Sequence, residues 1–319
     1  MRGAILQKNG PIDTLGLGEI AAPVPTSDEI LVRVHAAAVN PADVKVVTGE
    51  GGAGFIHAMR FPMAVGFDFS GVVEHVGPEV TSRAVGDEVF GHLAYSRSTR
   101  QGSFAEFVAV KPASVGIKPS SVSHEDAAAT ATVGCTALQA LRDEGGLKSG
   151  QRVLINGASG GVGSYAVQIA RQLGAEVWGT ASAAKGDFVR GLGAAEVIDY
   201  RSTPLASLGQ TFDVLLDAAA MSSFAETRHL LNRGGAYVTL LPSLSLFGGM
   251  ALSLFSSKRC TFVTVQSRAA DLEQLGDWMA AGELDASVER TYALSEVGAA
   301  LAALQSGAVQ GKLAIRVSG

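Results

Sequence analysis

Two polar side chains flank a proline where an apolar run ends. In "AVNPADVK", residues 38–45, Asn40 stands directly before Pro41 and Asp43 follows two residues later. An amide N–H can hydrogen-bond a substrate carbonyl, and a carboxyl group can relay a proton or order polar neighbours. Both residue types also cap backbone groups in turns. The segment therefore allows two interpretations, the polar floor of an active site or a structural turn, with Lys45 as a further candidate proton donor.

A glycine-rich turn indicates a second site, for a phosphate-bearing cofactor. "NGASGGVGS", residues 156–164, follows the strand-like "RVLIN", and Ala158, Gly160 and Gly163 take the glycine places of G-x-G-x-x-G. A small first residue permits a sharp turn, the second lets backbone N–H groups reach a pyrophosphate, and the third lets helix and strand pack closely. Any tight strand-to-helix corner needs glycine, but the position of this one in the first of several strand–helix units favours dinucleotide binding. The expected cofactor contacts are Ala158, Ser159, Gly160, Gly161 and Val162.

The end of the next strand selects between the two nicotinamide dinucleotides. NAD sites usually carry Asp or Glu there, which holds the ribose 2′-hydroxyl and would repel a 2′-phosphate. In "GTASAAKG", residues 179–186, no acid occurs, and Thr180, Ser182 and Lys185 provide two hydroxyls and a cation. Tyr200, at the end of the third strand, is expected to face the adenine end. Lys185 alone is equally an ordinary exposed helix lysine, but together the four residues predict NADPH.

The bulk composition limits the classes of function. At 319 residues the chain exceeds the size at which single cores usually stop growing, so two domains are expected. The net charge of −5 gives no electrostatic reason for a nucleic-acid or anionic-membrane partner. Two cysteines are too few for a disulfide scaffold or a four-thiolate zinc site. The uncharged residues 234–257 are interrupted by Pro242 and by two glycines, so they predict a strand, a loop and a short helix. A cytoplasmic protein is expected.

The pattern of strand-like and helix-like segments changes after residue 118. Up to there, short β-type runs such as "EILVRVHAAAV" alternate with turn residues, which predicts an antiparallel barrel or sandwich. Ser123 before an Ala-rich stretch predicts a helix N-terminus. From residue 152, strand-like and helix-like segments alternate as far as "TFVTV", which predicts a parallel sheet with right-handed crossovers. Two helices and the strand "GKLAIRV" are expected to close the chain.

With these features, the chain resembles the medium-chain dehydrogenase/reductase superfamily, and within it the zinc-free quinone oxidoreductase (zeta-crystallin-like) branch. The resemblance covers nearly the whole chain and rests on ordered blocks that include "AAAVNPADVK", "PMAVGFDFSGVVEHVGPEV", "GSFAEFVAV", "GASGGVGSYAVQIAR" and "GKLAIRV". It implies an α/β fold with a GroES-like β-barrel catalytic domain of residues 1–118 and 266–319. A Rossmann domain of residues 119–265, a doubly wound parallel sheet that binds NADPH, is inserted in it.

Departures from the zinc alcohol dehydrogenases of this superfamily imply that the catalytic zinc is missing. Those enzymes carry a cysteine ligand where this chain has Asn40, and Gly-His-Glu where it has Gly66, Phe67 and Asp68. Phenylalanine cannot ligate a metal ion. Without a Lewis acid, alcohol oxidation loses the usual stabilisation of its alkoxide. An acceptor that is already electron-poor, a quinone or an α,β-unsaturated carbonyl, is therefore expected.

The resemblance also implies roles for individual residues. Asn40 and Asp43 match polar residues beside the nicotinamide in the family's quinone reductases, which favours the active-site interpretation of Asn40 and leaves both interpretations open for Asp43. Phe61, Phe67 and Tyr95 are candidates to line the substrate cleft, with core packing the simpler role for Phe67. The matches to the family's cofactor contacts are Thr136 in "GCTALQAL", Leu240, Leu241 and Pro242 after the fifth strand, and Ala308, Val309 and Gln310 in the tail loop.

The sequence thus predicts a zinc-independent oxidoreductase that transfers hydride from NADPH to a quinone or an α,β-unsaturated carbonyl. One alternative is an enoyl-thioester reductase, which would need a cationic surface for the phosphates of its carrier. The other is a non-catalytic NADPH-binding protein. Family members dimerise through the edge strand that matches "CTFVTV", residues 260–265, so a homodimer is implied.

Overall fold

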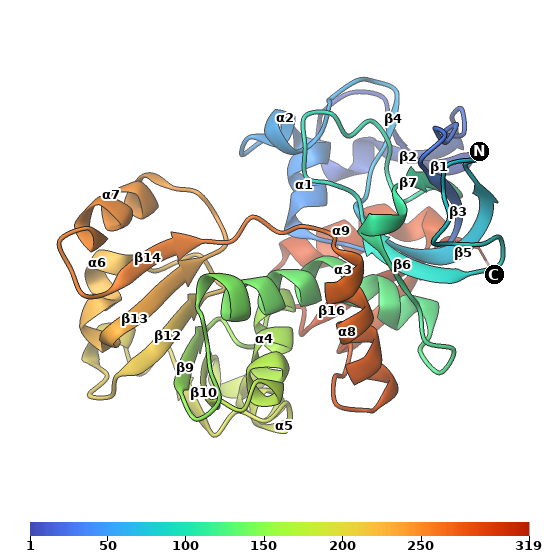
Figure 1. Cartoon of the computed structure of the whole chain (residues 1–319). Coiled ribbons are helices and arrows are strands. Elements are labelled where there is room, and N and C mark those ends of the chain that lie inside the picture. The colour runs from blue at the N-terminus through green and yellow to red at the C-terminus, as the bar shows by residue number, and fades with distance from the viewer. Residues whose placement is uncertain (319) are drawn as a thin grey trace. The chain divides into compact units, whose positions relative to one another are not determined.

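The computed structural model describes residues 1–318, which form two compact units (Figure 1). The first unit holds Met1–Cys135, Gln266–Ala281 and the chain from Ala286 onward. The second unit holds Thr136–Val265 and Gly282–Asp285. The second unit is therefore an insertion into the first, as the family resemblance implies.

The first unit is built on a seven-stranded sheet in the order β15-β16-β3-β5-β6-β8, with β7 paired to β3, and on a three-stranded sheet in the order β2-β1-β4. Its central strand β3, Ile30–Ala38, buries most of its apolar side chains. The closing strand β16, Lys312–Arg316, runs antiparallel to β3, with Ala314 opposite Ala38. The two ends of the chain thus complete one sheet. The other strands are β1 Arg2–Leu6, β2 Leu15–Glu19, β4 Met63–Ala64, β5 Asp68–Val76, β6 Glu88–His92, β7 Phe107–Val110, β8 Val115–Ile117 and β15 Val288–Ala293.

The first unit also contains helices. Ser123 caps the longest one, because its Oγ accepts a hydrogen bond of 3.0 Å from the backbone N–H of Asp126. The helix start predicted at Ser123 is therefore confirmed. The helices are α1 Pro41–Thr48, α2 Ala53–Ile56, α3 His124–Gln139, α8 Ala269–Ala280 and α9 Val297–Gln305.

The boundary between the units differs from the one expected after residue 118. The units divide inside α3, between Cys135 and Thr136. The first part of α3 belongs to the barrel unit because its side chains bond to barrel strands, as the 2.8 Å contact between His124 Nδ1 and Ser70 Oγ shows. Composition changes before the helix begins, whereas the contacts change in its last turn.

The second unit is a six-stranded parallel sheet in the order β11-β10-β9-β12-β13-β14, which confirms the predicted Rossmann architecture. The chain moves outward from β9 in one direction through β10 to β11, and in the other through β12 to β14. Ligands of such sheets bind where the order reverses, at the carboxyl ends of β9 and β12. The strands are β9 Arg152–Asn156, β10 Glu176–Ala181, β11 Glu196–Asp199, β12 Phe212–Asp217, β13 Leu231–Thr239 and β14 Arg259–Phe262.

The helices of the second unit lie along its sheet, with α4 and α5 beside β9 and β10, and α6 and α7 beside β13 and β14 (Figure 1). The uncharged residues 234–257 form most of β13, a loop and α7, as predicted. Within residues 1–318, no helix has both the length and the apolar character needed to span a membrane. The helices are α4 Gly161–Gln172, α5 Gly186–Gly191, α6 Phe224–Thr227 and α7 Leu244–Ser253.

Candidate cofactor and substrate sites

The glycine-rich turn joins β9 to α4 as the fingerprint predicts. Gly157 has a φ of 84°, a left-handed conformation that a side chain disfavours. A Cβ on Gly163 would lie 2.1 Å from the carbonyl oxygen of Gly157, so only glycine allows α4 to approach the strand this closely. Gly157 and Gly163 are therefore required by the fold itself.

Gly160 differs from those two glycines, because the protein does not need it for packing. A Cβ there would meet nothing closer than the Gly157 carbonyl oxygen at 3.5 Å, an ordinary van der Waals distance. Gly160 is also the N-cap of α4, whose first N–H groups have no partner within the helix. A turn that leaves open space in front of a helix N-terminus fits the pyrophosphate of a dinucleotide.

Thr180 holds the glycine turn in place. Its Oγ1 donates to Asn156 Oδ1 at 2.7 Å and accepts from the Gly157 N–H at 2.9 Å. Asn156 Nδ2 in turn donates to Asp217 Oδ1 at 2.8 Å. These side chains are buried at the carboxyl ends of β9, β10 and β12. Thr180, predicted as a phosphate contact, thus uses its hydroxyl to fix the loop that would receive the cofactor.

The other residues predicted to select the dinucleotide lie at the ends of β10 and β11. The Tyr200 N–H donates to the Ala181 carbonyl at 3.3 Å, which brings Tyr200 next to Ser182. Lys185 follows in the turn that precedes α5. The guanidinium group of Arg201 lies 5.9 Å from the centre of the Tyr200 ring. Arg201 was not among the cofactor contacts predicted from the sequence. A cation at this place is a further candidate to bind a 2′-phosphate. The dipeptide "YR" after the strand is the sequence feature that could have indicated Arg201.

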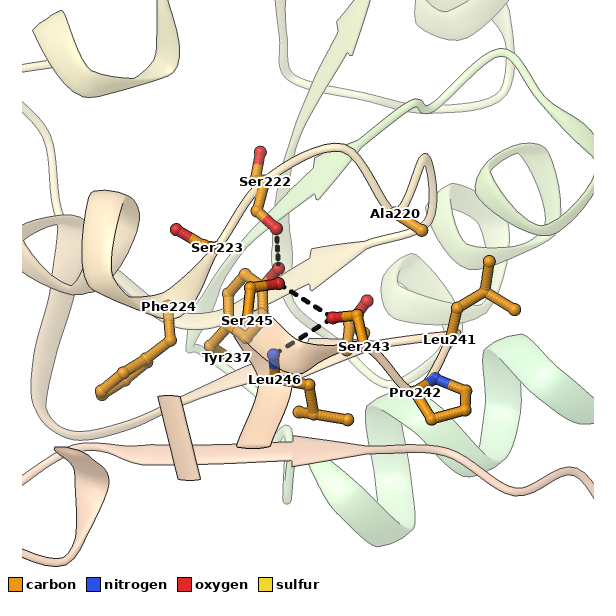
Figure 2. Close-up of a pocket in the computed structure, with 11 residues that line it drawn as sticks. Ala220, Ser222, Ser223, Phe224, Tyr237, Leu241, Pro242, Ser243, Ser245 and Leu246 are labelled. Carbon is orange, nitrogen blue, oxygen red and sulfur yellow. Dashed lines mark hydrogen bonds between the residues drawn. The ribbon is translucent and has the colours of Figure 1, made fainter. Parts of the chain in front are cut away.

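A cavity of about 200 Å³ opens beyond the carboxyl ends of β12 and β13 (Figure 2). Leu241 and Pro242, two of the predicted nicotinamide contacts, form part of its wall, whereas Leu240 is not among its lining residues. The Tyr237 hydroxyl lies 2.9 Å from Asp217 Oδ2 and 2.8 Å from the Ser222 carbonyl. Burial and the Asp217 carboxylate raise the pKa of Tyr237. The wall is rich in hydroxyls, which no sequence motif indicated: Ser222, Ser223, Tyr237, Thr239, Ser243 and Ser245.

In the first unit, the segment "AVNPADVK", residues 38–45, contains the start of α1. Asn40 is the N-cap residue, and its backbone N–H donates to Asp43 Oδ2 at 2.6 Å. Asp43 therefore caps the helix, as the structural interpretation proposed. Its other oxygen, Oδ1, is buried without a hydrogen-bond partner within residues 1–318. Burial raises the pKa of Asp43 well above its usual range, and the neighbouring Asp68 adds to that effect.

The Asn40 side chain belongs to a buried ionic cluster that includes Asp68 and Lys312. Lys312 Nζ donates to Asn40 Oδ1 at 2.6 Å and to the Val39 carbonyl at 2.8 Å, and lies 3.5 Å from Asp68 Oδ2. Asn40 Nδ2 donates to the same Asp68 oxygen at 2.8 Å. Burial lowers the pKa of Lys312, while Asp68 and Asp43 oppose that effect. An amide nitrogen carries two hydrogens, and Asp68 accepts from one of those of Asn40, a residue that is 3% exposed.

The cluster continues through Thr132 to Tyr95. Asp68 Oδ1 accepts hydrogen bonds from the backbone N–H and the hydroxyl of Thr132. The Tyr95 hydroxyl lies 3.2 Å from Thr132 Oγ1, and its ring stacks on Phe67 with 4.2 Å between ring centres. Burial, with the two carboxyl groups nearby, raises the pKa of Tyr95 well above its usual range. Asn40, Asp68, Lys312, Thr132 and Tyr95 are called the polar network below.

The remaining residues that the sequence predicted for the site lie outside the cavity and outside the polar network. Thr136 is buried in α3, in the second unit. Ala308, Val309 and Gln310 form the turn before β16 in the first unit, where the Gln310 N–H donates to Glu289 Oε2 at 2.6 Å. Phe67 is fully buried, in line with core packing. In the part of the chain that the structure describes, no three His, Cys, Asp or Glu side chains gather as metal ligands.

Two family models match the chain. Residues 26–120 match the alcohol dehydrogenase GroES-like domain, and residues 192–315 match the zinc-binding dehydrogenase model. The first match lies in the barrel unit and contains Asn40 and Asp68. The second covers most of the parallel sheet and the chain's return to the barrel, including Lys312.

Relatives of known name agree with these matches. The human protein "NAD(P)H oxidoreductase RTN4IP1, mitochondrial" is 33% identical, over 91% of this chain and 82% of its own. The "Trans-enoyl reductase pgmF" of Aspergillus terreus is also 33% identical, over 91% and 86%. The quinone oxidoreductase structure from Coxiella burnetii superposes with a TM-score of 0.90 at 29% identity, over 100% of this chain and 99% of the other. The chain is thus an NAD(P)H oxidoreductase and belongs to the medium-chain dehydrogenase/reductase superfamily, in its quinone oxidoreductase branch.

Proposed function

We propose that this protein is an NADPH-dependent, metal-independent reductase of quinones or α,β-unsaturated carbonyls. The observation that carries the proposal is the Asn40 carboxamide, held at its oxygen by Lys312 and at one N–H by Asp68. The remaining N–H is a fixed donor of the kind that stabilises negative charge developing on a carbonyl oxygen. Bound NADPH would supply the hydride.

The charges around Asn40 support reduction without a metal ion. The Lys312 ammonium already provides the buried positive charge next to Asn40 and Asp68. A divalent cation at the same oxygens would be repelled by that ammonium at close range. The raised pKa of Asp43 means that this carboxyl keeps its proton to higher pH than an exposed one, which suits a proton-donating role.

The ends of β10 and β11 support NADPH over NADH. Ser182 lies where an NAD site usually has a carboxylate, and Tyr200 with its stacked Arg201 lies beside it. Asp199, the last residue of β11, turns Oδ1 to the Arg201 backbone N–H at 3.0 Å. Hydroxyl and guanidinium groups at this place would hydrogen-bond a 2′-phosphate.

The function is tested with protein dialysed against a chelator, its metal content measured by mass spectrometry. We expect NADPH fluorescence to change on binding, and NADPH to be oxidised when small quinones or enones are added. Binding without turnover of any acceptor in a broad panel would replace the proposal by a non-catalytic NADPH-binding protein. Activity that is lost on chelation and restored by zinc would contradict metal independence.

The cofactor preference is tested by Ser182→Asp combined with Lys185→Ala. The new carboxylate should repel the 2′-phosphate and shift the ratio of kcat/KM for NADPH and NADH towards NADH by more than about tenfold, or about 1.4 kcal/mol. Lys148→Ala, which removes an exposed lysine elsewhere in the second unit, is the matched control and should leave the ratio unchanged. An unchanged ratio in the double variant would show that these residues do not hold the phosphate.

The proposal includes a homodimer formed through β14 and the residues after it, 260–265. Strand β14 is the last strand of its sheet, so one of its edges is unpaired within residues 1–318. Helix α7 lies beside β14, and this region exposes Leu244, Phe247, Leu254 and Phe255, with Phe255 91% exposed. Exposed apolar side chains of this kind support burial against a second copy through a two-fold interface.

The dimer is tested by light scattering coupled to size-exclusion chromatography. The wild type is expected at twice the chain mass. Leu254→Glu with Phe255→Glu should yield a monomer, because each change places a charge in the apolar contact. Val24→Glu alters a residue of the first unit that is 87% exposed and should leave the dimer intact. A monomeric wild type, or a double variant that stays dimeric, would refute this interface.

A further inference from the structure

Asp217, the last residue of β12, is a fully buried carboxyl group with hydrogen-bond donors at both of its oxygens. Oδ1 accepts from Asn156 Nδ2 at 2.8 Å and from the Met221 N–H at 3.4 Å. Oδ2 accepts from the Ser222 N–H at 2.8 Å and lies 2.9 Å from the Tyr237 hydroxyl, which is also 2.8 Å from the Ser222 carbonyl (Figure 2). Because an ionised carboxyl group only accepts hydrogen bonds, Asp217 fixes the direction of each bond that its neighbours make to it.

These fixed directions extend from Asp217 to the glycine-rich turn. Since Asp217 accepts, Asn156 must turn Nδ2 towards it, and Asn156 Oδ1 therefore faces Thr180. The Thr180 hydroxyl has one hydrogen, which it donates to Asn156 Oδ1 at 2.7 Å. Thr180 Oγ1 is thereby left as an acceptor for the Gly157 N–H at 2.9 Å. The carboxyl group of Asp217 thus determines, through two side chains, where the Gly157 N–H points.

The turn that follows β12 packs against the same glycine. The Ala219 N–H donates to the Asn156 carbonyl at 3.1 Å, and a Cβ on Gly157 would lie 2.9 Å from Ala219 Cβ. Ala220 has a φ of 52°, a left-handed conformation that is uncommon for a residue with a side chain and that occurs where surrounding bonds enforce it. The Asp217 carbonyl accepts the Ala220 N–H at 3.2 Å, in addition to the bonds of its carboxyl group. Asp217 therefore holds both turns at once.

We propose that Asp217 is a positioning residue for NADPH, which orders the glycine-rich turn for the pyrophosphate through Asn156 and Thr180. The inference rests on the proposed function, because it takes NADPH to bind at this turn. Asp217 is fully buried, so it acts through these two residues and not by contact with the cofactor. With the Gly157 N–H held by Thr180, the N–H groups at the start of α4 are the ones left to bind the phosphates.

Asp217→Asn tests the fixed bond directions while keeping the size of the side chain. In either orientation of the new amide, its N–H₂ group faces another donor, which is Asn156 Nδ2 on one side and the Ser222 N–H on the other. A buried hydrogen bond is lost in both cases, and one of the two turns at Gly157 is displaced. The dissociation constant of NADPH, measured by its fluorescence, should therefore rise by about tenfold or more.

The exchange of the two side chains, Asn156→Asp with Asp217→Asn, should restore binding. The carboxyl group at position 156 would accept from Thr180 with one oxygen and from the amide at position 217 with the other. The amide oxygen at position 217 would still accept the Ser222 N–H. Because every bond direction is recovered although the charge has moved, this variant should bind NADPH at least about fivefold more tightly than Asp217→Asn alone.

Asp213 provides a matched control at the opposite end of β12. Its carboxyl group accepts from Asn232 Nδ2 at 2.9 Å and from the Arg152 N–H at 2.9 Å, so it has the same kinds of partner as Asp217. Asp213→Asn disturbs these bonds away from the glycine-rich turn and should leave the dissociation constant of NADPH within about twofold of the wild type. Thermal unfolding of each variant without nucleotide shows whether it is folded.

A second nucleotide separates positioning from general damage to the sheet. 2′-AMP carries the adenine and the 2′-phosphate of NADPH but has no pyrophosphate. Calorimetry should show that Asp217→Asn weakens NADPH binding and leaves the affinity for 2′-AMP within about twofold of the wild type. An equal loss for both nucleotides would overturn the inference, because it would show that Asp217 only supports the sheet.

Other outcomes also decide against the inference. Unchanged NADPH affinity in a folded Asp217→Asn protein, or no recovery in the exchange variant, would overturn it. Should Asp217→Asn fail to fold, the exchange variant is measured by itself. Wild-type affinity for NADPH then supports the inference, and an exchange variant that binds no NADPH or does not fold overturns it. A wild-type protein that binds no NADPH would instead refute the proposed function.

Discussion

The buried ammonium of Lys312 is the interaction on which the first unit depends. Transferring such a charge out of water costs on the order of several kcal/mol, unless partners compensate for the lost hydration. Lys312 is 3% exposed and finds three oxygens, from Val39, Asn40 and Asp68. These partners precede it by more than 240 residues, so the bond closes the chain's last strand onto its first long one.

The same ammonium determines what Asn40 can do. A carboxamide with two equivalent orientations would present either an acceptor or a donor to a ligand. Lys312 donates to the oxygen and Asp68 accepts from the nitrogen, so only a donor remains. The second unit fixes its glycine turn through the Thr180 hydroxyl, which bonds the turn and the Asn156 side chain, and Asn156 is held in turn by the Asp217 carboxyl group. The first unit thus fixes the Asn40 carboxamide as a hydrogen-bond donor. The second unit fixes the glycine-rich turn, whose N–H groups at the start of α4 have no partner within the helix.

Local features were predictable from the sequence, and long-range partners were not. Gly163 could be predicted because the packing of a helix on the preceding strand is fixed within a few residues. Lys312 was seen only as part of a closing strand, since its partners lie 272 and 244 residues away. Thr180 was identified by its position, but its hydroxyl turns inward to the loop.

The most direct test of this account is Asn40→Ala, measured by kcat/KM for the acceptor and by the dissociation constant of NADPH. Asn9→Ala is the structural control, because Asn9 Nδ2 donates to the Val46 carbonyl at 2.9 Å and supports α1 from its other end. Asn40→Ala is expected to lower kcat/KM by about tenfold or more, about 1.4 kcal/mol, with NADPH affinity unchanged and no such loss in the control. Unchanged kcat/KM, or an equal loss of NADPH affinity, would contradict it.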